Sequence, residues 1–225
     1  MEPIKNAAGI LFRMSGECAP HAIRIGLAAA LLAAGPVQTS FAEQAARQAP
    51  KISPSGALDG LTCKNGGRIA ALSASRVKKG GRHYLEFRTR LLPGSPSGHL
   101  YVVFGELDAR LNVVSRHQTG LMPVGSILGF YGGTLAPLPG KTSPQYLDCY
   151  GGTLSAWRIS VSAAQYNAIV RKARASLRQP PLWSMFGYNC NHYAAEFGDL
   201  AGLRRPKNPA LPSVSYLPAY IEANK

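Results

Sequence analysis

The feature that most constrains the fold is a series of short segments with the pattern of β-strands between residues 82 and 161. From His83 to Leu91, apolar and polar side chains alternate, which is typical of a strand with one buried and one exposed face. Residues 93–98 (PGSPSG) and 105–111 are expected to be connecting turns. Further runs rich in β-branched and aromatic residues lie at 99–104, 112–119 and 154–161. The pattern therefore predicts a β-sheet.

Two helices are expected to follow the strands. Ser162 and Gln165 have the spacing of a capping box, and apolar residues then recur with helical spacing until the prolines at 180–181. That apolar stripe consists of Tyr166, Ile169, Val170, Ala173 and Leu177. A second helix is predicted over about 189–201 and is stopped by Gly202. Strands and helices together predict the α+β class.

Length and composition agree with a folded domain. Of the 225 residues, 46% are hydrophobic and 16% are charged. This is enough apolar side chain for a core, and it excludes a disordered polyelectrolyte. The chain is too short for several large domains. The Gly- and Pro-rich segment 120–152 is expected to be a lid or substrate-binding loop, with a strand at 126–131.

The N-terminal fifth of the chain has the three parts of a secretory signal peptide. Basic residues precede a ten-residue apolar run at 25–34, and a small-x-small cleavage site ends at Ala42. Such a run is too short to span a bilayer, which takes about 20 residues. Residues 1–42 are therefore predicted to be removed, and an uncleaved anchor or a buried core helix is the alternative. The start is either Met1 or Met14.

Export changes which partners are expected. Cleavage after residue 42 removes three basic and two acidic residues, so the formal charge falls only from +14 to +13. In the periplasm or outside the cell, a basic protein meets anionic lipid or envelope polymer, so no nucleic-acid partner is expected. No other segment reaches transmembrane length. The mature chain is predicted to comprise a low-order linker at 43–80, a domain at 81–203 and an extended tail at 204–225.

The cysteine count limits the chemistry of the mature chain. Cys18 leaves with the signal peptide, so Cys63, Cys149 and Cys190 remain. An odd count in an oxidising compartment suggests one disulfide and one free thiol. Cys63 and Cys149 lie in Gly-rich, turn-like surroundings, as bridge cysteines often do, but the sequence leaves all three pairings open. No CxxC pair is present, and neither a metal nor another cofactor is expected.

The start of the second predicted helix carries the strongest sign of chemistry. Asn189 is a good N-cap and places Cys190 in the first turn, on the same face as Tyr193, Ala194 and Phe197. The helix dipole and the unpaired backbone N–H groups favour a thiolate there, as a cysteine nucleophile requires. The alternative is a structural cysteine that fills a contact between helix and sheet.

A thiolate nucleophile needs an imidazole partner, and four histidines are candidates. His192 lies two positions along the same helix, about 200° away, and is expected to pair with Glu196 or to cap local structure. His99 opens a strand directly after a turn, where a helix N-terminus can face it. His117 lies on the next strand, and hairpin pairing would bring it alongside. His83 is expected at the surface.

Two segments, GHLYVVFG (98–105) and NCNHYAAEFGDLAG (189–202), resemble the circularly permuted NlpC/P60-like cysteine hydrolases, nearest the lecithin:retinol acyltransferase-like branch. In that family a strand begins with a catalytic histidine, and a later Asn-Cys-x-His-aromatic motif opens a helix. The resemblance covers roughly residues 82–202. It implies a papain-like α+β fold, with an antiparallel sheet packed against the helix that bears the nucleophile. It also implies that Cys190 is the nucleophile and His99 the general base.

The resemblance leaves the third polar residue open. The family often has a second histidine about a dozen residues after the first, whereas His117 follows after 18 residues. Either His117 or another group, such as Ser115, would take that role. The family often has an acidic residue where this chain has Asn191. Tyr188 and Asn189, beside the nucleophile, are candidates for substrate or oxyanion contacts.

These residues predict an exported cysteine hydrolase or acyltransferase that attacks an amide or ester carbonyl and forms a thioester. The expected substrate is an envelope peptide or a lipid acyl group. The alternative is a non-catalytic binding or structural module on the same fold, with Cys190 inert or disulfide-bonded.

Overall fold

The computed structural model describes residues 58–93, 95–125, 133, 136–208 and 210–225. They belong to one unit of the chain, Ile52–Lys225. The predicted signal peptide with its cleavage site, the first part of the predicted linker and the strand expected at 126–131 lie outside the described residues.

Five strands form the central sheet, in the order β1-β7-β2-β3-β4. Their bounds are β1 (Ala74–Arg76), β2 (His83–Leu92), β3 (Ser95–Leu107), β4 (Val113–Thr119) and β7 (Ser155–Val161). The α+β class is confirmed. The sheet is mixed, however, because β1 runs parallel to β7 while the other neighbours are antiparallel. The prediction of an antiparallel sheet is thus wrong at this edge, where the long connection between β1 and β7 permits parallel pairing.

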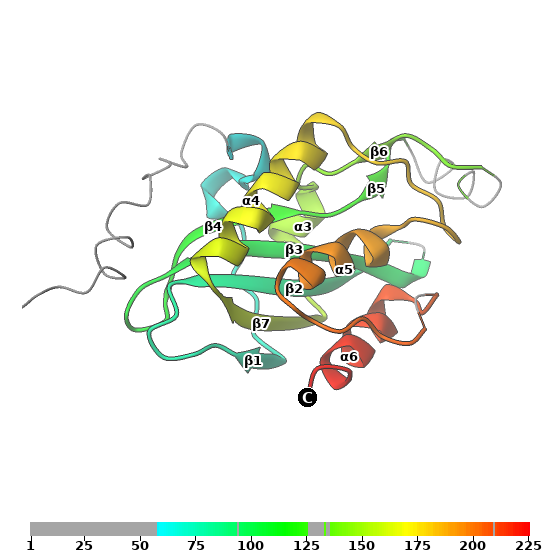
Figure 1. Ribbon diagram of the computed structural model, residues 1–225. Coiled ribbons are helices and arrows are strands. Elements are labelled where there is room, and N and C mark those ends of the chain that lie inside the picture. The colour runs from blue at the N-terminus through cyan, green and yellow to red at the C-terminus, as the bar shows by residue number, and fades with distance from the viewer. Residues whose placement is uncertain (1–57, 94, 126–132, 134–135, 209) are drawn as a thin grey trace, which may run out of the picture. The chain divides into compact units, whose positions relative to one another are not determined.

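Three helices cover one face of the sheet (Figure 1): α4 (Ala163–Arg178), α5 (Cys190–Leu200) and α6 (Ser213–Glu222). They share a core of buried side chains that includes Leu85, Phe87, Leu100, Val102, Trp157, Tyr166, Ile169, Tyr193, Phe197, Tyr216 and Tyr220. No helix in the described ranges has the length and apolarity that crossing a bilayer requires.

Short elements complete the fold. They are the 3-10 turns η1 (Asp59–Leu61) and η2 (Lys64–Gly66), a two-stranded sheet of β5 (Met122–Pro123) and β6 (Gly140–Lys141), and the helix α3 (Tyr146–Tyr150). The segment 120–152, predicted as a long loop, therefore contains α3 and the small sheet among its described residues.

The two predicted helices are confirmed with their caps. In α4, Gln165 N donates to Ser162 Oγ at 3.2 Å and Ser162 N donates to Gln165 Oε1 at 2.8 Å, which completes the capping box. Asn189 caps α5. A Cβ at Gly198 of α5 would lie 1.6 Å from Tyr220 Oη. The close packing of α5 on α6 therefore requires glycine at this position.

β2 is buried on both faces, not on one as its alternation predicts. Glu86 is 0% and Arg88 is 2% exposed. Arg88 and Arg158 both pair with Glu86, and Arg88 Nη1 donates to Arg68 O at 3.0 Å. The chain before β1 thus covers the second face, and its carbonyl groups and the ion pairs satisfy the buried charges.

Two segments expected to be irregular contain regular structure. The described part of the predicted linker includes η1, η2 and β1, and Leu58 and Leu61 are fully buried. The tail at 204–225, predicted to be extended, contains α6. The prolines at 212 and 218 make this segment look extended in the sequence. Pro212, however, lies at the N-cap, where a proline does not prevent the helix from starting, and Pro218 lies inside the helix. The buried stripe consists of Ser213, Tyr216, Leu217 and Tyr220.

Candidate functional site

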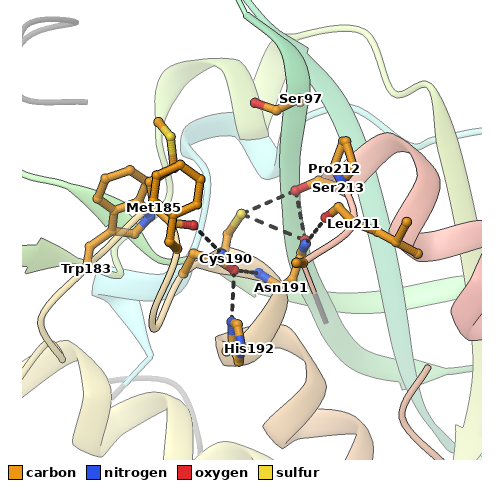
Figure 2. A pocket seen from close by; sticks show the side chains of 13 residues that line it. Ser97, Trp183, Met185, Cys190, Asn191, His192, Leu211, Pro212 and Ser213 are labelled. Carbon is orange, nitrogen blue, oxygen red and sulfur yellow. Dashed lines mark hydrogen bonds between the residues drawn. The ribbon is translucent and has the colours of Figure 1, made fainter. Parts of the chain in front are cut away.

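A pocket of about 260 Å³ opens where the first residues of α5 and α6 meet the start of β3 (Figure 2). Its lining includes Trp183, Met185, Phe186, Asn189, Cys190, Asn191, His192, Leu211, Pro212 and Ser213. Cys190 is half-buried and lines this pocket. None of these described lining residues is an Asp, Glu, Lys or Arg.

The N-cap residue fixes the position of Cys190. Asn189 Oδ1 accepts from the backbone N–H of Asn191 at 3.0 Å and lies 3.1 Å from His192 Nδ1. Asn189 Nδ2 donates to Met185 O at 3.0 Å. The side chain predicted to contact substrate therefore lines the pocket, but both ends of its amide serve the helix start and the preceding loop. His192 contacts this cap, which is one of its two expected roles, and Glu196 pairs with Lys172.

The environment of the Cys190 sulfur favours the thiolate. Burial alone would raise the thiol pKa, but the imidazole of His99 lowers it through hydrogen bonding and charge. The backbone N–H of Leu100 and the hydroxyl of Ser213 act in the same direction, and the net result is a pKa below the usual thiol value. Cys190 also starts a helix, whose dipole favours an anion at that end.

His99 lies on the part of β3 that extends beyond its pairing with β4. The ladder between β3 and β4 ends at Val102 and Thr119, so the backbone of His99 and Leu100 is not paired with β4. The side chain of His99 is 0% exposed. A Cβ on Gly120 would lie 2.8 Å from His99 Nε2, so glycine leaves the room that the ring occupies.

The imidazole of His99 acts on the Cys190 thiol without an aligned hydrogen bond to it. His99 lowers the pKa of the Cys190 thiol, yet neither ring nitrogen of His99 has an aligned hydrogen-bond partner among the described residues. We interpret the pair as adjacent and imperfectly directed, since catalytic hydrogen bonds often tighten only when substrate is bound.

The carboxylate of Asp148 lies near this imidazole, and no pattern in the sequence points to it. Its Oδ1 lies 3.8 Å from His99 Nε2 and accepts from Arg90 Nε at 2.7 Å. Its Oδ2 accepts from the backbone N–H of Gln145 at 3.0 Å, at the start of α3. Arg90 is the cross-strand partner of His99. The capping-box spacing of Gln145 and Asp148 was the available signal for the helix that presents this carboxylate.

A disulfide holds α3 beside the sheet. Of the three pairings, the structure contains the one between Cys63 and Cys149, with Cα atoms 5.6 Å apart, and Cys190 is free. Cys149 follows Asp148 directly in the chain. The bridge therefore anchors the element that carries the carboxylate near His99.

The structure does not bring the remaining predicted residues to the sulfur. His117 pairs with Phe104, five residues along β3 from His99 and about 17 Å away at strand spacing, and its Nδ1 lies 3.0 Å from Thr62 Oγ1. Ser115 Oγ accepts from Glu106 N at 3.0 Å, further along the same ladder. The register of β3 and β4 thus places both residues further along the ladder, away from His99.

Tyr188 is also occupied elsewhere. Its hydroxyl donates to Glu196 Oε1 at 2.7 Å, and burial followed by that carboxylate raises its pKa. The hydroxyl therefore points along α5, and a role at the oxyanion is not supported. His83, expected at the surface, is partly buried and stacks on Tyr166, with ring centroids 4.4 Å apart.

No group of three or more His, Cys, Asp or Glu side chains in the described part of the chain is arranged to hold a metal ion. No model of a known protein family, no curated protein and no solved structure matches the chain. The function of the site is therefore argued from its own geometry.

Proposed function

We propose that the protein is a thiol hydrolase or acyltransferase of papain-like fold, with Cys190 as nucleophile and His99 as general base. One observation carries the proposal: the free cysteine begins a helix at an open pocket, beside a fully buried imidazole that lowers its pKa. These are the features of an activated cysteine nucleophile. The resemblance of residues 98–105 and 189–202 to the permuted NlpC/P60-like hydrolases supports the same roles.

The chemistry begins when His99 takes the Cys190 proton. The thiolate sulfur forms a bond to the substrate carbonyl carbon, and the π electron pair moves to the carbonyl oxygen. The tetrahedral intermediate collapses as the C–N or C–O bond breaks, and the leaving group takes the proton from His99. Water or another acceptor then attacks the thioester, gives its proton to His99, and displaces the thiolate as the C–S bond breaks.

Two features of the chain would support these steps. The backbone N–H of Cys190, at the start of α5, has no partner inside the helix and would donate to the oxyanion, whereas that of Asn191 already donates to Asn189 Oδ1. Asp148, 3.8 Å from His99 Nε2, would orient the ring and stabilise its protonated form, acting as a positioning residue. Asp148 thus replaces His117 as the third polar residue.

The pocket wall favours an uncharged, apolar group next to the scissile carbonyl. Met185, Leu211 and Pro212 line it, and Phe186, 82% exposed, stands at its edge. An amide or an ester with an apolar acyl side fits this lining better than a charged group does. We further propose that the protein is exported to the periplasm or outside the cell, where its charge of +13 after cleavage would attract it to an anionic envelope surface.

The test is hydrolysis of a panel of aryl esters of increasing acyl length and of neutral peptide amides. Cys190→Ala and His99→Gln are each expected to reduce kcat/KM by at least about 10³-fold, because each removes a group that changes bonds or protons. His117→Gln is the matched control, since this half-buried histidine lies outside the site, and it should retain the activity.

A folded wild-type protein that turns over none of these substrates, or a Cys190→Ala variant as active as wild type, would contradict the proposal. Either result would favour the non-catalytic module with an inert Cys190. Thermal unfolding of each variant shows whether a loss of activity is a loss of fold.

A further inference from the structure

Two helix N-termini meet at the Cys190 sulfur, and the Cys-His pair alone does not explain the second. Cys190 is the first residue of α5 and Ser213 is the first residue of α6. Cys190 Sγ and Ser213 Oγ are 3.3 Å apart. Figure 2 shows this hydroxyl and the Asn191 amide oxygen facing the sulfur from the same side. The C-terminal helix therefore places a hydroxyl in contact with the reacting atom.

The Ser213 hydroxyl has two acceptors and one proton. It donates to Asn191 Oδ1 at 2.8 Å, while the neutral Cys190 thiol is itself within reach of Ser213 Oγ and, at 4.0 Å, of Asn191 Oδ1. The Asn191 amide cannot readily turn away, because its Nδ2 donates to Leu211 O at 2.8 Å. Ser213 and Asn191 are 4% and 3% exposed, so water does not compete freely for these groups.

The start of α6 is held firmly against the strand that carries His99. Gly98 has φ +70°, and a Cβ there would lie 2.7 Å from Val214 Cγ1 and 2.8 Å from Arg90 O. The N-cap of α6 is Pro212, which makes no side-chain hydrogen bond to the helix. The positive end of the α6 dipole is therefore left without a capping side chain beside the sulfur.

We propose that Ser213 is a further catalytic residue: its hydroxyl donates to Asn191 while Cys190 is protonated and turns to the sulfur when the thiolate forms. The inference rests on the proposed function for its use in catalysis, but the switch itself requires only the thiol. Rotation about the Ser213 Cβ–Oγ bond exchanges one acceptor for the other with no movement of the backbone, and no covalent bond to Ser213 forms or breaks.

Charge decides which acceptor the hydroxyl prefers. A hydrogen bond to an ionised sulfur is stronger than one to a neutral amide oxygen, so the proton follows the negative charge. Ser213 is among the groups that lower the Cys190 pKa. Among the described residues, the titratable group that acts on this sulfur is His99 from β3, with Asp148 behind it; His192 also lines the pocket, but its ring contacts Asn189 Oδ1.

The test is the pH dependence of iodoacetamide alkylation, measured on the full chain by mass spectrometry of the peptide that contains Cys190. In Ser213→Ala the thiolate loses a donor, so alkylation below the thiol pKa should slow by about tenfold. Ser215→Ala is the matched control, because Ser215 is exposed on the same turn of α6, and its profile should equal that of wild type.

Asn191→Ala separates the switch from a packing role. This variant frees the Ser213 hydroxyl for the sulfur, so alkylation at low pH should be as fast as in wild type or faster. An unchanged profile in Ser213→Ala, or the same slowing in both variants, overturns the proposal. Because alkylation needs no substrate, a shifted profile in a protein that hydrolyses nothing would separate failure of the proposed function from failure of the switch.

Discussion

The face of the sheet under α4, α5 and α6 and the opposite face are filled by different kinds of side chain. The helix-covered face contains apolar and aromatic residues such as Phe87 and Trp157. The opposite face contains Glu86 between Arg88 and Arg158, with a small apolar cluster around Tyr84. Both faces are buried, so the same strands are apolar on one side and ionic on the other. We call the side that contains Glu86, Arg88 and Arg158 the ionic face.

Residues from both sides of the sheet contribute to the candidate site. Cys190 comes from α5 on the apolar side. His99 lies on the same side of β3 as Tyr101, with ring centroids 5.8 Å apart, and faces Asp148 on the ionic side. The difference teaches that apolar packing positions the nucleophile, whereas ion pairs and a disulfide position the residue behind the base.

The largest expected effect comes from removing the disulfide of the ionic face. Replacing Cys63 and Cys149 with serine opens a loop of 86 residues and should lower the free energy of unfolding by about 4 kcal/mol. Urea denaturation measures it. Cys190→Ser is the control, because it removes a free cysteine and should change stability by less than about 1 kcal/mol.

Reduction of the wild-type protein should reproduce the loss seen in the double variant. If the double variant were as stable as wild type, the ionic face would be held by its ion pairs and backbone hydrogen bonds without the bridge. The comparison between the two faces would then lose its covalent part.

A smaller effect is expected from the buried carboxylate at the centre of that face. Glu86→Gln leaves Arg88 and Arg158 without a charged partner and should lower the free energy of unfolding by about 3 kcal/mol. Glu106→Gln is the matched control, because Glu106 is 44% exposed and its pairing with His83 spans 4.0 Å.

Salt sharpens this comparison. The loss in Glu86→Gln should persist at high ionic strength, because buried pairs are poorly screened, while any effect of Glu106→Gln should vanish. Equal and small losses in both variants would show that the buried cluster adds no more than a surface pair.

The sequence anticipated those elements whose signals are local. The capping box of Ser162 and Gln165 and the N-cap at Asn189 were read correctly, because a cap depends on residues within one helical turn. The strands are predicted from patterns that are equally local, namely alternation and runs of β-branched and aromatic residues. Cys190 opens α5 as predicted, but His99, predicted to open a strand after a turn at 93–98, lies within β3, which already begins at Ser95.

What the sequence did not show depends on distant contacts. The alternation along β2 predicts an exposed face, but the chain around Arg68 covers that face in the folded protein. His117 was placed beside His99, but the β3–β4 register opposes it to Phe104. Asp148 reaches the site on α3, the helix that the Cys63–Cys149 disulfide holds in place. The spacing of residues in the sequence shows neither that Cys149 pairs with Cys63 nor that Asp148 lies 3.8 Å from His99.

The smallest of the three effects tests whether the ionic face acts on the chemistry at all. Asp148→Asn keeps the shape of the side chain but removes the charge 3.8 Å from His99 Nε2, so kcat/KM should fall by about 10- to 100-fold. Arg90→Gln breaks the same ion pair with Asp148 but leaves the carboxylate facing His99. A positioning role predicts that Asp148→Asn loses more activity than Arg90→Gln at equal stability, and that it alone shifts the pH profile. Equal losses and unchanged profiles would mean that Asp148 serves only the fold, and the site would then contain Cys190 and His99 without a partner from the ionic face.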